Sequence, residues 1–271
     1  MTGWVRALRE AVLDASALVA PVDCAGCSAP DRALCPACRA ALHPSPRSAV
    51  LRAPAGAPPL PVVAGLAYEG VARAAILALK QEGRTELART LAPALLVAAD
   101  RGWAAFGRAD ALLVPVPGSP EAARQRGFHP AALLARRAGL APRPLLRLAD
   151  AGDGPQKGRA LAERLDADRR ISTGRRLDGC AVVLLDDVVT SGATLLAAAA
   201  ALRGAGALVL GAVALAATPR RVGSAAVEWS TGPAAGIPSA PPSSAAIPSG
   251  SRTDASRMRM GEPLTHAPPG D

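Results

Sequence analysis

The sequence predicts an α/β fold in which a parallel sheet, covered by helices, follows a small metal-binding module. Short apolar segments of strand length alternate with longer segments of helical period. One apolar segment, residues 182–185, runs directly into two aspartates and a turn of small residues, which is typical of a parallel strand that ends at a ligand. Four cysteines in two Cys-x2-Cys pairs precede all of these segments.

Composition and charge restrict the class of protein. The chain has 271 residues, half of them hydrophobic, which is enough for one α/β domain plus a small module. No charge-free apolar run reaches the ~20 residues of a membrane-spanning helix, and residues 4–19 show an amphipathic pattern instead of an export signal. We therefore expect a cytoplasmic protein without membrane insertion. The net charge of +9 suits a polyanionic ligand, either a pyrophosphate or a nucleic acid.

The first part of the chain, residues 1–43, is expected to contain an N-terminal helix and a zinc ribbon. Cys24, Cys27, Cys35 and Cys38 form two knuckles that can direct four sulfur atoms at one Zn²⁺. A disulfide pair or a redox motif is the alternative, but a reducing cytosol and the lack of a βαβ context favour structural zinc. His43 could also be a ligand, although four thiolates already complete the shell.

The remaining elements follow from periodicity and from proline and glycine punctuation. Residues 44–60 are expected to form a linker, residues 61–222 the main domain and residues 223–271 a disordered tail. Strands are expected at 61–68, 111–116, 145–148, 182–185 and 208–215, and helices at 71–80, 87–99, 130–137, 160–167 and 194–203. Cys180 is expected to be a small buried hydrophobic residue just before the central strand.

The strongest candidate site lies after the 182–185 strand. Asp186 and Asp187 offer adjacent carboxylates, which suit the two vicinal hydroxyls of a ribose because each hydroxyl can donate a hydrogen bond. The small residues that follow can close their backbone N–H groups and hydroxyls around a phosphate at the start of the next helix; they are Thr190, Ser191, Gly192, Ala193 and Thr194. The alternative is an ordinary strand-to-helix turn with two solvated aspartates.

This segment resembles the signature of phosphoribosyltransferases of the type I fold. That signature has four apolar residues, two acidic residues, two variable residues and then Thr-x-Gly-x-Thr, and residues 182–194 match all of it. The resemblance implies a type I phosphoribosyltransferase-like sheet. It also implies that Asp186 and Asp187 hold the ribose of phosphoribosyl pyrophosphate (PRPP), with Mg²⁺, as the catalytic pair, while residues 190–194 hold the 5′-phosphate.

Further segments resemble the ComF family, which is associated with competence and DNA uptake. After the paired cysteine knuckles, the chain has a segment with Tyr68, Gly70, Arg73, Leu79, Lys80 and Gly83, then Pro115-Val116-Pro117, and then Arg124, Arg126, Gly127 and Phe128. The resemblance covers Cys24 to about Pro219. His129 stands where the family usually has Asn, and we expect it to be a residue that starts a helix.

The candidate pyrophosphate site draws on all three of these segments. Pro117 and Gly118 follow a strand and are expected to present backbone amides, as the corresponding loop does in related transferases. Arg124 and Arg126 are close enough in sequence to neutralise the leaving group, and Lys80 offers a point charge. The alternatives are solvated arginines on a helix face and a lysine whose stem covers apolar surface.

A candidate lid lies between residues 150 and 170. This basic, glycine-rich stretch occupies the place where the phosphoribosyltransferase superfamily has a flexible loop that closes over the substrate. Gln156, Lys157 and Arg164 are its candidate binding residues. The alternative is a linker followed by an ordinary helix.

The resemblance implies displacement of pyrophosphate at the anomeric carbon by a nitrogenous nucleophile. No Ser-His-Asp set, His-Glu-x-x-His motif or Walker A loop is present, so hydrolase and NTPase classes have no support. A non-catalytic DNA-uptake adaptor that binds single-stranded DNA or a helicase is the alternative, although aromatic stacking residues are scarce. A pyrimidine-sensing regulator on the same fold is the third.

Overall fold

The computed structural model describes residues 22–30, 32–52, 57–108, 110–148, 171–219 and 229–231. Several sequence predictions lie outside these ranges. They are the N-terminal helix, the 160–167 helix, the candidate lid with Gln156, Lys157 and Arg164, and all of the tail except residues 229–231. The chain divides into residues 1–240 and residues 241–271, and every described residue belongs to the first unit.

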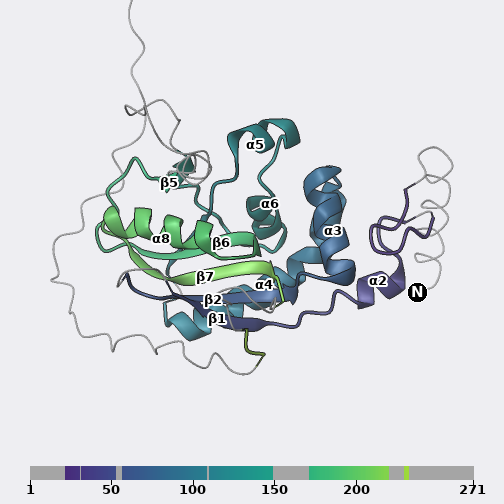
Figure 1. Cartoon of the computed structure of the whole chain (residues 1–271), viewed down its shortest axis with the longest axis horizontal. Helices are drawn as coiled ribbons and strands as arrows, with labels where there is room; N and C mark the ends of the chain where they lie inside the picture. The colour runs from purple at the N-terminus through teal and green to yellow at the C-terminus, as the bar shows by residue number, and fades with distance from the viewer. Residues whose placement is uncertain are drawn as a thin grey trace, which may run out of the picture. The chain divides into compact units, whose positions relative to one another are not determined.

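The centre of this unit is a five-stranded sheet with the order β1-β2-β7-β6-β3 (Figure 1). The strands are β1 (Arg47–Leu51), β2 (Leu60–Ala67), β3 (Leu112–Pro115), β6 (Ala181–Val189) and β7 (Leu208–Ala217). β2, β7, β6 and β3 are parallel to their neighbours, and β1 is antiparallel to β2 at one edge. The predicted mostly parallel sheet is therefore confirmed.

Helices cover both faces of the sheet because the central strands are apolar on both sides. Val183 and Leu185 of β6 point into a core shared with α3 (Gly70–Gln81), α4 (Ala88–Phe106) and α6 (Pro130–Arg137). Val182 and Leu184 point into a second core with α8 (Ala193–Gly204) on the opposite face, as Figure 1 shows. All four β6 side chains are at most 1% exposed, as expected for a parallel strand covered on both sides.

Shorter elements complete the described part of the chain. They are α2 (Pro36–Ala40), the 3-10 turn η1 (Thr85–Leu87), α5 (Pro120–Arg126), β4 (Arg147–Leu148) and β5 (Ile171–Ser172). Across the described ranges, none of the helices combines the length and the hydropathy that a bilayer crossing requires.

Three sequence expectations need correction. Residues 47–51 of the predicted 44–60 linker form the edge strand β1. These five residues contain no proline and three of them are apolar, so they can pair with β2. Only residues 147–148 of the predicted 145–148 strand are extended, and they pair with β5 outside the main sheet, since Pro144 and Arg147 suit neither a long nor an interior strand. In the predicted tail, Ser230 bridges to Ser48 of β1 and Trp229 packs against the α8-side core.

Candidate functional site

The two aspartates lie at a point where β6 loses one neighbouring strand. β3 pairs with β6 only as far as Pro115 opposite Leu185, whereas β7 continues beside β6 to Val189. β6 thus extends four residues past the strand predicted from sequence and carries Asp186 and Asp187 beyond the last residue of β3. This leaves polar side chains at the carboxyl end of the sheet, where ligands bind in open α/β folds.

Asp187 is held by a lysine from a distant helix. Its Oδ1 lies 3.0 Å from Nζ of Lys80 on α3, and the two side chains are 12% and 31% exposed. Asp187 is buried, and a buried carboxylate without a partner would be costly. The ion pair therefore stabilises the acidic end of β6 and brings together two residues 107 positions apart.

Asp186 occupies an environment that opposes its ionisation. Burial and the charge of Asp187 raise the pKa of its carboxyl group to about 7, although the Asp187 N–H and the Lys80 ammonium act in the opposite direction. The Asp187 N–H donates a 2.8 Å hydrogen bond to Oδ1 of Asp186. At neutral pH this end of β6 can therefore change its charge when hydroxyl donors or a cation arrive.

The small-residue turn after β6 is open to solvent. Thr190, Ser191 and Ala193 are exposed, while Gly192 is buried with φ of +76° immediately before α8. A Cβ on Gly192 would lie 2.5 Å from Cδ1 of Leu51 in β1, so both the backbone conformation and the space require glycine.

Backbone donors in this turn remain available to a ligand. Among the described residues, the N–H groups of Thr190, Ser191 and Gly192 have no acceptor, and the first N–H groups of α8 have none within the helix. The hydroxyl of Ser191 accepts a weak 3.4 Å bond from Ala193. The turn is thus suited to bind an anion at the positive end of α8.

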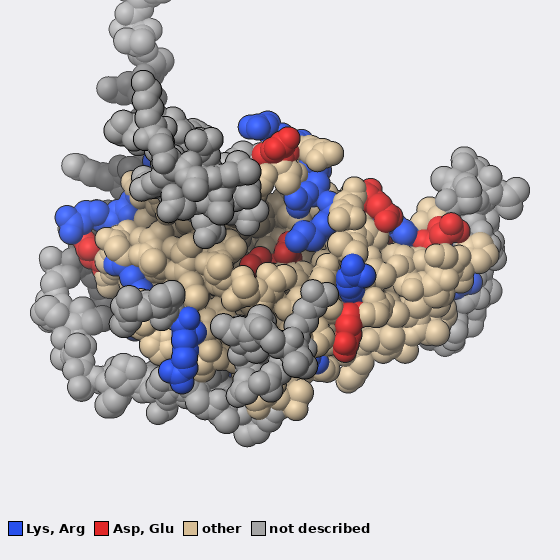
Figure 2. All heavy atoms as spheres, viewed as in Figure 1, with Lys and Arg blue, Asp and Glu red and all other residues tan. Residues whose placement is uncertain are grey.

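The segment that follows β3 borders the same end of β6. The Val116 N–H donates a 2.9 Å bond to the Leu185 carbonyl, which places half-buried Pro117 and exposed Gly118 directly after the sheet. Ser119 then caps α5 by accepting a bond from Ala122 at 3.2 Å. Figure 2 shows acidic and basic atoms side by side near the middle of this face, over the region where β6 meets α6 and α3 in Figure 1.

The basic residues of α5 differ in exposure. Arg124 is exposed and Arg126 is half-buried, and neither forms an ion pair with another described residue. The charge of Arg126 nevertheless acts on His129, as do those of Asp187 and Lys80. At least one arginine of the predicted pyrophosphate set is therefore close to the Lys80–Asp187 pair.

Residues 125–231 match the family model of the phosphoribosyl transferase domain. The matched span contains Arg126, His129, the two aspartates, the small-residue turn and β7, whereas Lys80 and Pro117 precede it. A search of curated proteins gave no match to the chain. The fold is thus a mixed α/β sheet that carries a phosphoribosyltransferase domain, with a cysteine cluster before it.

The structure brings several predicted residues of the phosphoribosyltransferase domain together. Asp186, Asp187, Lys80 and the 190–194 turn converge at the end of β6, and the Pro117–Gly118 segment adjoins them through Val116. Their individual roles remain predictions. Sequence reasoning missed the Lys80–Asp187 pair and the support that Leu51 gives to Gly192, because both depend on contacts between distant elements.

His129 has a second contact that the sequence did not predict. It caps α6 by accepting a 3.4 Å bond from Ala132 at Nδ1, as expected for a residue that starts a helix. Its Nε2 also lies 2.9 Å from the Val116 carbonyl. The pKa of the imidazole is lowered, first by burial. The Pro at the next position signals the cap, but no local pattern signals the bond to Val116.

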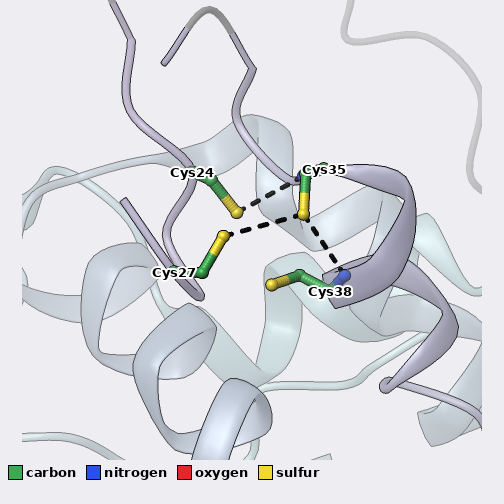
Figure 3. A group of neighbouring side chains, drawn as sticks. All are labelled: Cys24, Cys27, Cys35 and Cys38. Atoms are coloured by element: carbon green, nitrogen blue, oxygen red, sulfur yellow. Dashed lines mark hydrogen bonds between the residues drawn. The ribbon is translucent and has the colours of Figure 1, made fainter. Parts of the chain in front are cut away.

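The cysteine cluster precedes the phosphoribosyltransferase domain and has the geometry of a metal site. The four sulfur atoms, from Cys24, Cys27, Cys35 and Cys38, all lie within 4.8 Å of one another (Figure 3). The Sγ atoms of Cys27 and Cys35 are 3.7 Å apart, and a tetrahedral ion with Zn–S bonds of about 2.3 Å separates its sulfurs by about 3.8 Å. None of the five cysteines of the chain forms a disulfide.

The charges of the four thiols also fit a metal. Burial opposes ionisation of Cys24, but N–H groups of Cys35, Gly26 and Cys27 lower its pKa to about 6. Burial and the neighbouring sulfurs raise the pKa of Cys38 to about 12. The Cys24 thiolate is thus favoured and the Cys38 thiolate is costly without a cation, which fits a cluster suited to structural zinc.

The cysteine module packs directly on α3, which carries Lys80. Cys24, Leu34, Cys38 and Leu42 share one apolar core with α3. At the start of α3, Gly26 lies so close to Val71 that a Cβ on this glycine would be 3.0 Å from Cγ1. Beyond the end of α3, Nη2 of Arg84 donates a 3.3 Å bond to the Ala33 carbonyl.

Proposed function

We propose that the chain binds PRPP with Mg²⁺ at the carboxyl end of β6 and transfers its ribosyl phosphate to a nitrogenous acceptor. The observation that supports this most directly is the position of Asp186 and Asp187 beside an open turn of small residues that begins α8. A ribose 5-phosphate carries a diol and a phosphate on one sugar, so hydrogen-bond acceptors and donors placed side by side at one edge of a sheet suit it.

Each part of the proposed ligand has a matching set of groups. The carboxylates accept hydrogen bonds from the ribose hydroxyls, and the 190–194 turn donates to the 5′-phosphate. Lys80, Arg126 and the Pro117–Gly118 segment face the pyrophosphate. Arg124 and the candidate lid residues Gln156, Lys157 and Arg164 belong to the same proposal. Mg²⁺, when bound, neutralises charge on the leaving group, and the aspartates are of the ligand type that it prefers.

The reaction requires no covalent attachment to the protein. The bond between the anomeric carbon and the pyrophosphate oxygen breaks, and its electron pair leaves with pyrophosphate. The lone pair of the acceptor nitrogen forms the new carbon–nitrogen bond, after which the nitrogen loses a proton. The protein contributes orientation and electrostatic stabilisation of the leaving group, which are large terms in such displacements.

We also propose that the chain is a cytoplasmic member of the ComF family with a structural Zn²⁺. The four-cysteine cluster, its place before a phosphoribosyltransferase domain and the order of the intervening segments support this proposal. No observation in the described part of the chain favours a DNA-binding or helicase-binding adaptor, so that alternative is not carried forward.

Calorimetric titration with PRPP and MgCl₂ tests the binding step. We expect saturable binding to the wild type and a loss of at least about 100-fold for Asp186→Asn plus Asp187→Asn, because two hydrogen bonds to charged acceptors are removed. The matched control is Asp110→Asn plus Asp178→Asn, in which both side chains are more than 60% exposed and pair with surface arginines. No binding to the wild type, or equal binding by all three proteins, would overturn the proposal.

Transfer is tested separately by measuring pyrophosphate release during a screen of bases and amines. A binding-competent wild type that releases pyrophosphate with at least one acceptor supports a transferase. Binding without release from any acceptor restricts the function to PRPP binding and contradicts the catalytic part of the proposal.

A further inference from the structure

His129 uses both ring nitrogens within the fold. Ala132 presents a backbone N–H, which can only donate, so Nδ1 at 3.4 Å is the acceptor. The ring hydrogen of the neutral imidazole is then on Nε2, which lies 2.9 Å from the Val116 carbonyl and donates to it. Burial favours this neutral form by lowering the pKa of the ring. The side chain therefore has one fixed orientation and one fixed tautomer.

Val116 is held from both sides as a result. Its N–H donates to the Leu185 carbonyl at 2.9 Å, and its own carbonyl accepts from His129. Val116 is 4% exposed, so a free carbonyl at this position would lack water as a partner. Pro115 and Pro117, on either side, restrict φ and have no N–H to donate. The peptide plane that leads into Pro117 and Gly118 is thus fixed by His129.

The imidazole is also the side chain nearest to where Gly118 would carry a Cβ. A Cβ at that position would lie 4.0 Å from Nε2 of His129. The charged groups that act on the ring are Asp187, Arg126 and Lys80. They come from β6, α5 and α3, so His129 is within electrostatic reach of all three charged elements of the candidate site.

We propose that His129 is a positioning residue that orients the Pro115–Gly118 segment for pyrophosphate by donating from Nε2 to the Val116 carbonyl. This inference rests on the proposed function, because it assigns the segment to the pyrophosphate part of PRPP. The capping of α6 by His129 is a separate role, which the other ring nitrogen, Nδ1, performs. The two roles are therefore separable by substitution.

Two substitutions divide the roles of the ring. In His129→Asn, the side-chain oxygen occupies the place of Nδ1 and still caps α6, since Asn is a good N-cap, but no donor reaches Val116. In His129→Gln, the longer amide reaches the place of Nε2 and can donate to Val116, while the cap is lost. Loss of the cap is expected to destabilise the start of α6 and to lower Tm.

The experiment measures thermal stability and calorimetric binding of Mg²⁺-PRPP, Mg²⁺-pyrophosphate and ribose 5-phosphate. His129→Asn is expected to weaken both pyrophosphate-containing ligands about three- to tenfold, with ribose 5-phosphate and Tm close to wild type. His129→Gln is expected to bind all three ligands within about twofold of wild type and to melt at a lower temperature.

The outcomes separate this inference from the proposed function. If the wild type binds no PRPP, the proposed function fails first. If the wild type binds PRPP and His129→Asn binds pyrophosphate equally well, or loses ribose 5-phosphate to the same extent, His129 has no specific role in positioning the segment. A histidine with only a structural role would not give weakened pyrophosphate binding in His129→Asn together with near wild-type binding in His129→Gln.

Discussion

The cysteine module and the site at the end of β6 are organised in opposite ways. All four sulfur ligands come from residues 24–38, and the short helix α2 and two turns bring them together. The groups at the end of β6 come from α3, β3, α6 and β6, and the Lys80–Asp187 pair joins residues 107 positions apart. The first site is a product of local spacing, whereas the second exists only when the whole sheet has formed.

This difference extends to what stabilises each region. The module contributes only a few side chains to the apolar core, so we expect its fold to depend on a metal, as in other small cysteine sites. The site at β6 is surrounded by two complete cores and depends on packing. The two regions meet at α3, which contacts the module and also carries Lys80.

The strongest way to break the comparison is to remove the metal site. Cys24→Ser plus Cys38→Ser removes two of the four sulfurs and is expected to abolish binding of about one Zn²⁺ per chain. The module should then lose stability, because structural zinc supplies ~10–16 kcal/mol to such modules. Hydrogen exchange should then increase at residues 24–38 and along α3, and remain unchanged in β6 and β7. Cys180→Ser is the matched control and should keep the metal. Unaltered exchange at α3 would show that the two regions are independent.

A glycine substitution tests the packing that supports the β6 site. Gly192→Ala is expected to lower the free energy of unfolding by about 2–4 kcal/mol, because φ is +76° and Leu51 occupies the space of a Cβ. A Cβ on Gly204, at the other end of α8, would have no neighbour within 4 Å, so Gly204→Ala should raise the free energy of unfolding by up to about 1 kcal/mol. Equal effects of both variants in denaturant titrations would contradict the role of Leu51.

The pH dependence of stability sharpens the comparison further. The folded-state pKa of Asp186 is raised to about 7 from an ordinary value of 3.8, so the folded chain binds this proton more tightly than the unfolded chain. The stabilisation that comes from this tightly bound proton is therefore fully present below about pH 4 and is lost as the pH rises through 7. Asp186→Asn should be more stable than wild type at pH 8, by up to about 4 kcal/mol, and equally stable near pH 4.

The control for this titration has the opposite sign. Arg108 lowers the pKa of Asp110, so the ionised Asp110 stabilises the folded chain at pH 8 and this stabilisation is lost at low pH. Asp110→Asn should therefore not be more stable than wild type at pH 8, and any difference between the two should disappear as the pH falls. Thermal melts of both variants between about pH 2 and pH 8 measure the two slopes, because the Asp110 effect is lost only below its ordinary pKa of 3.8. Parallel slopes for Asp186→Asn and wild type would show that Asp186 is ionised in the usual range.

The smallest expected effect concerns the contact between the two regions. Arg84→Met removes the bond to the Ala33 carbonyl and should reduce the local opening free energy of the module by about 0.5–1.5 kcal/mol. Hydrogen exchange at residues 32–35 measures it. Arg108→Met removes an exposed pair with Asp110 and should leave the module unchanged.

The fold was predictable where local signals agree with the tertiary structure. Residues 130–137 form α6 as expected, because a capping residue and a proline mark its start. The central strand was also recognisable from its apolar run. Its last four residues were not, since Asp186 and Asp187 end the apolar run although β6 continues to pair with β7 as far as Val189. β1 was missed because the prolines around it dominate the composition of residues 44–60.

The candidate site was predictable in its residue types and not in its contacts. Adjacent carboxylates and a glycine-containing turn can be read from one segment, and so can four cysteines. The partner of Asp187, the support under Gly192 and the second bond of His129 each join segments far apart in the chain. Such contacts follow from strand order and helix placement, which a single sequence does not specify.

The ion pair between Lys80 and Asp187 means that this carboxylate has a counterion attached to the same chain. Dilution or dialysis removes a free cation from a carboxylate, but it leaves an ammonium that is attached to the same chain. Any group that binds Oδ1 of Asp187 must therefore exchange with that ammonium, so its affinity is the difference between its own attraction to the carboxylate and that of Lys80.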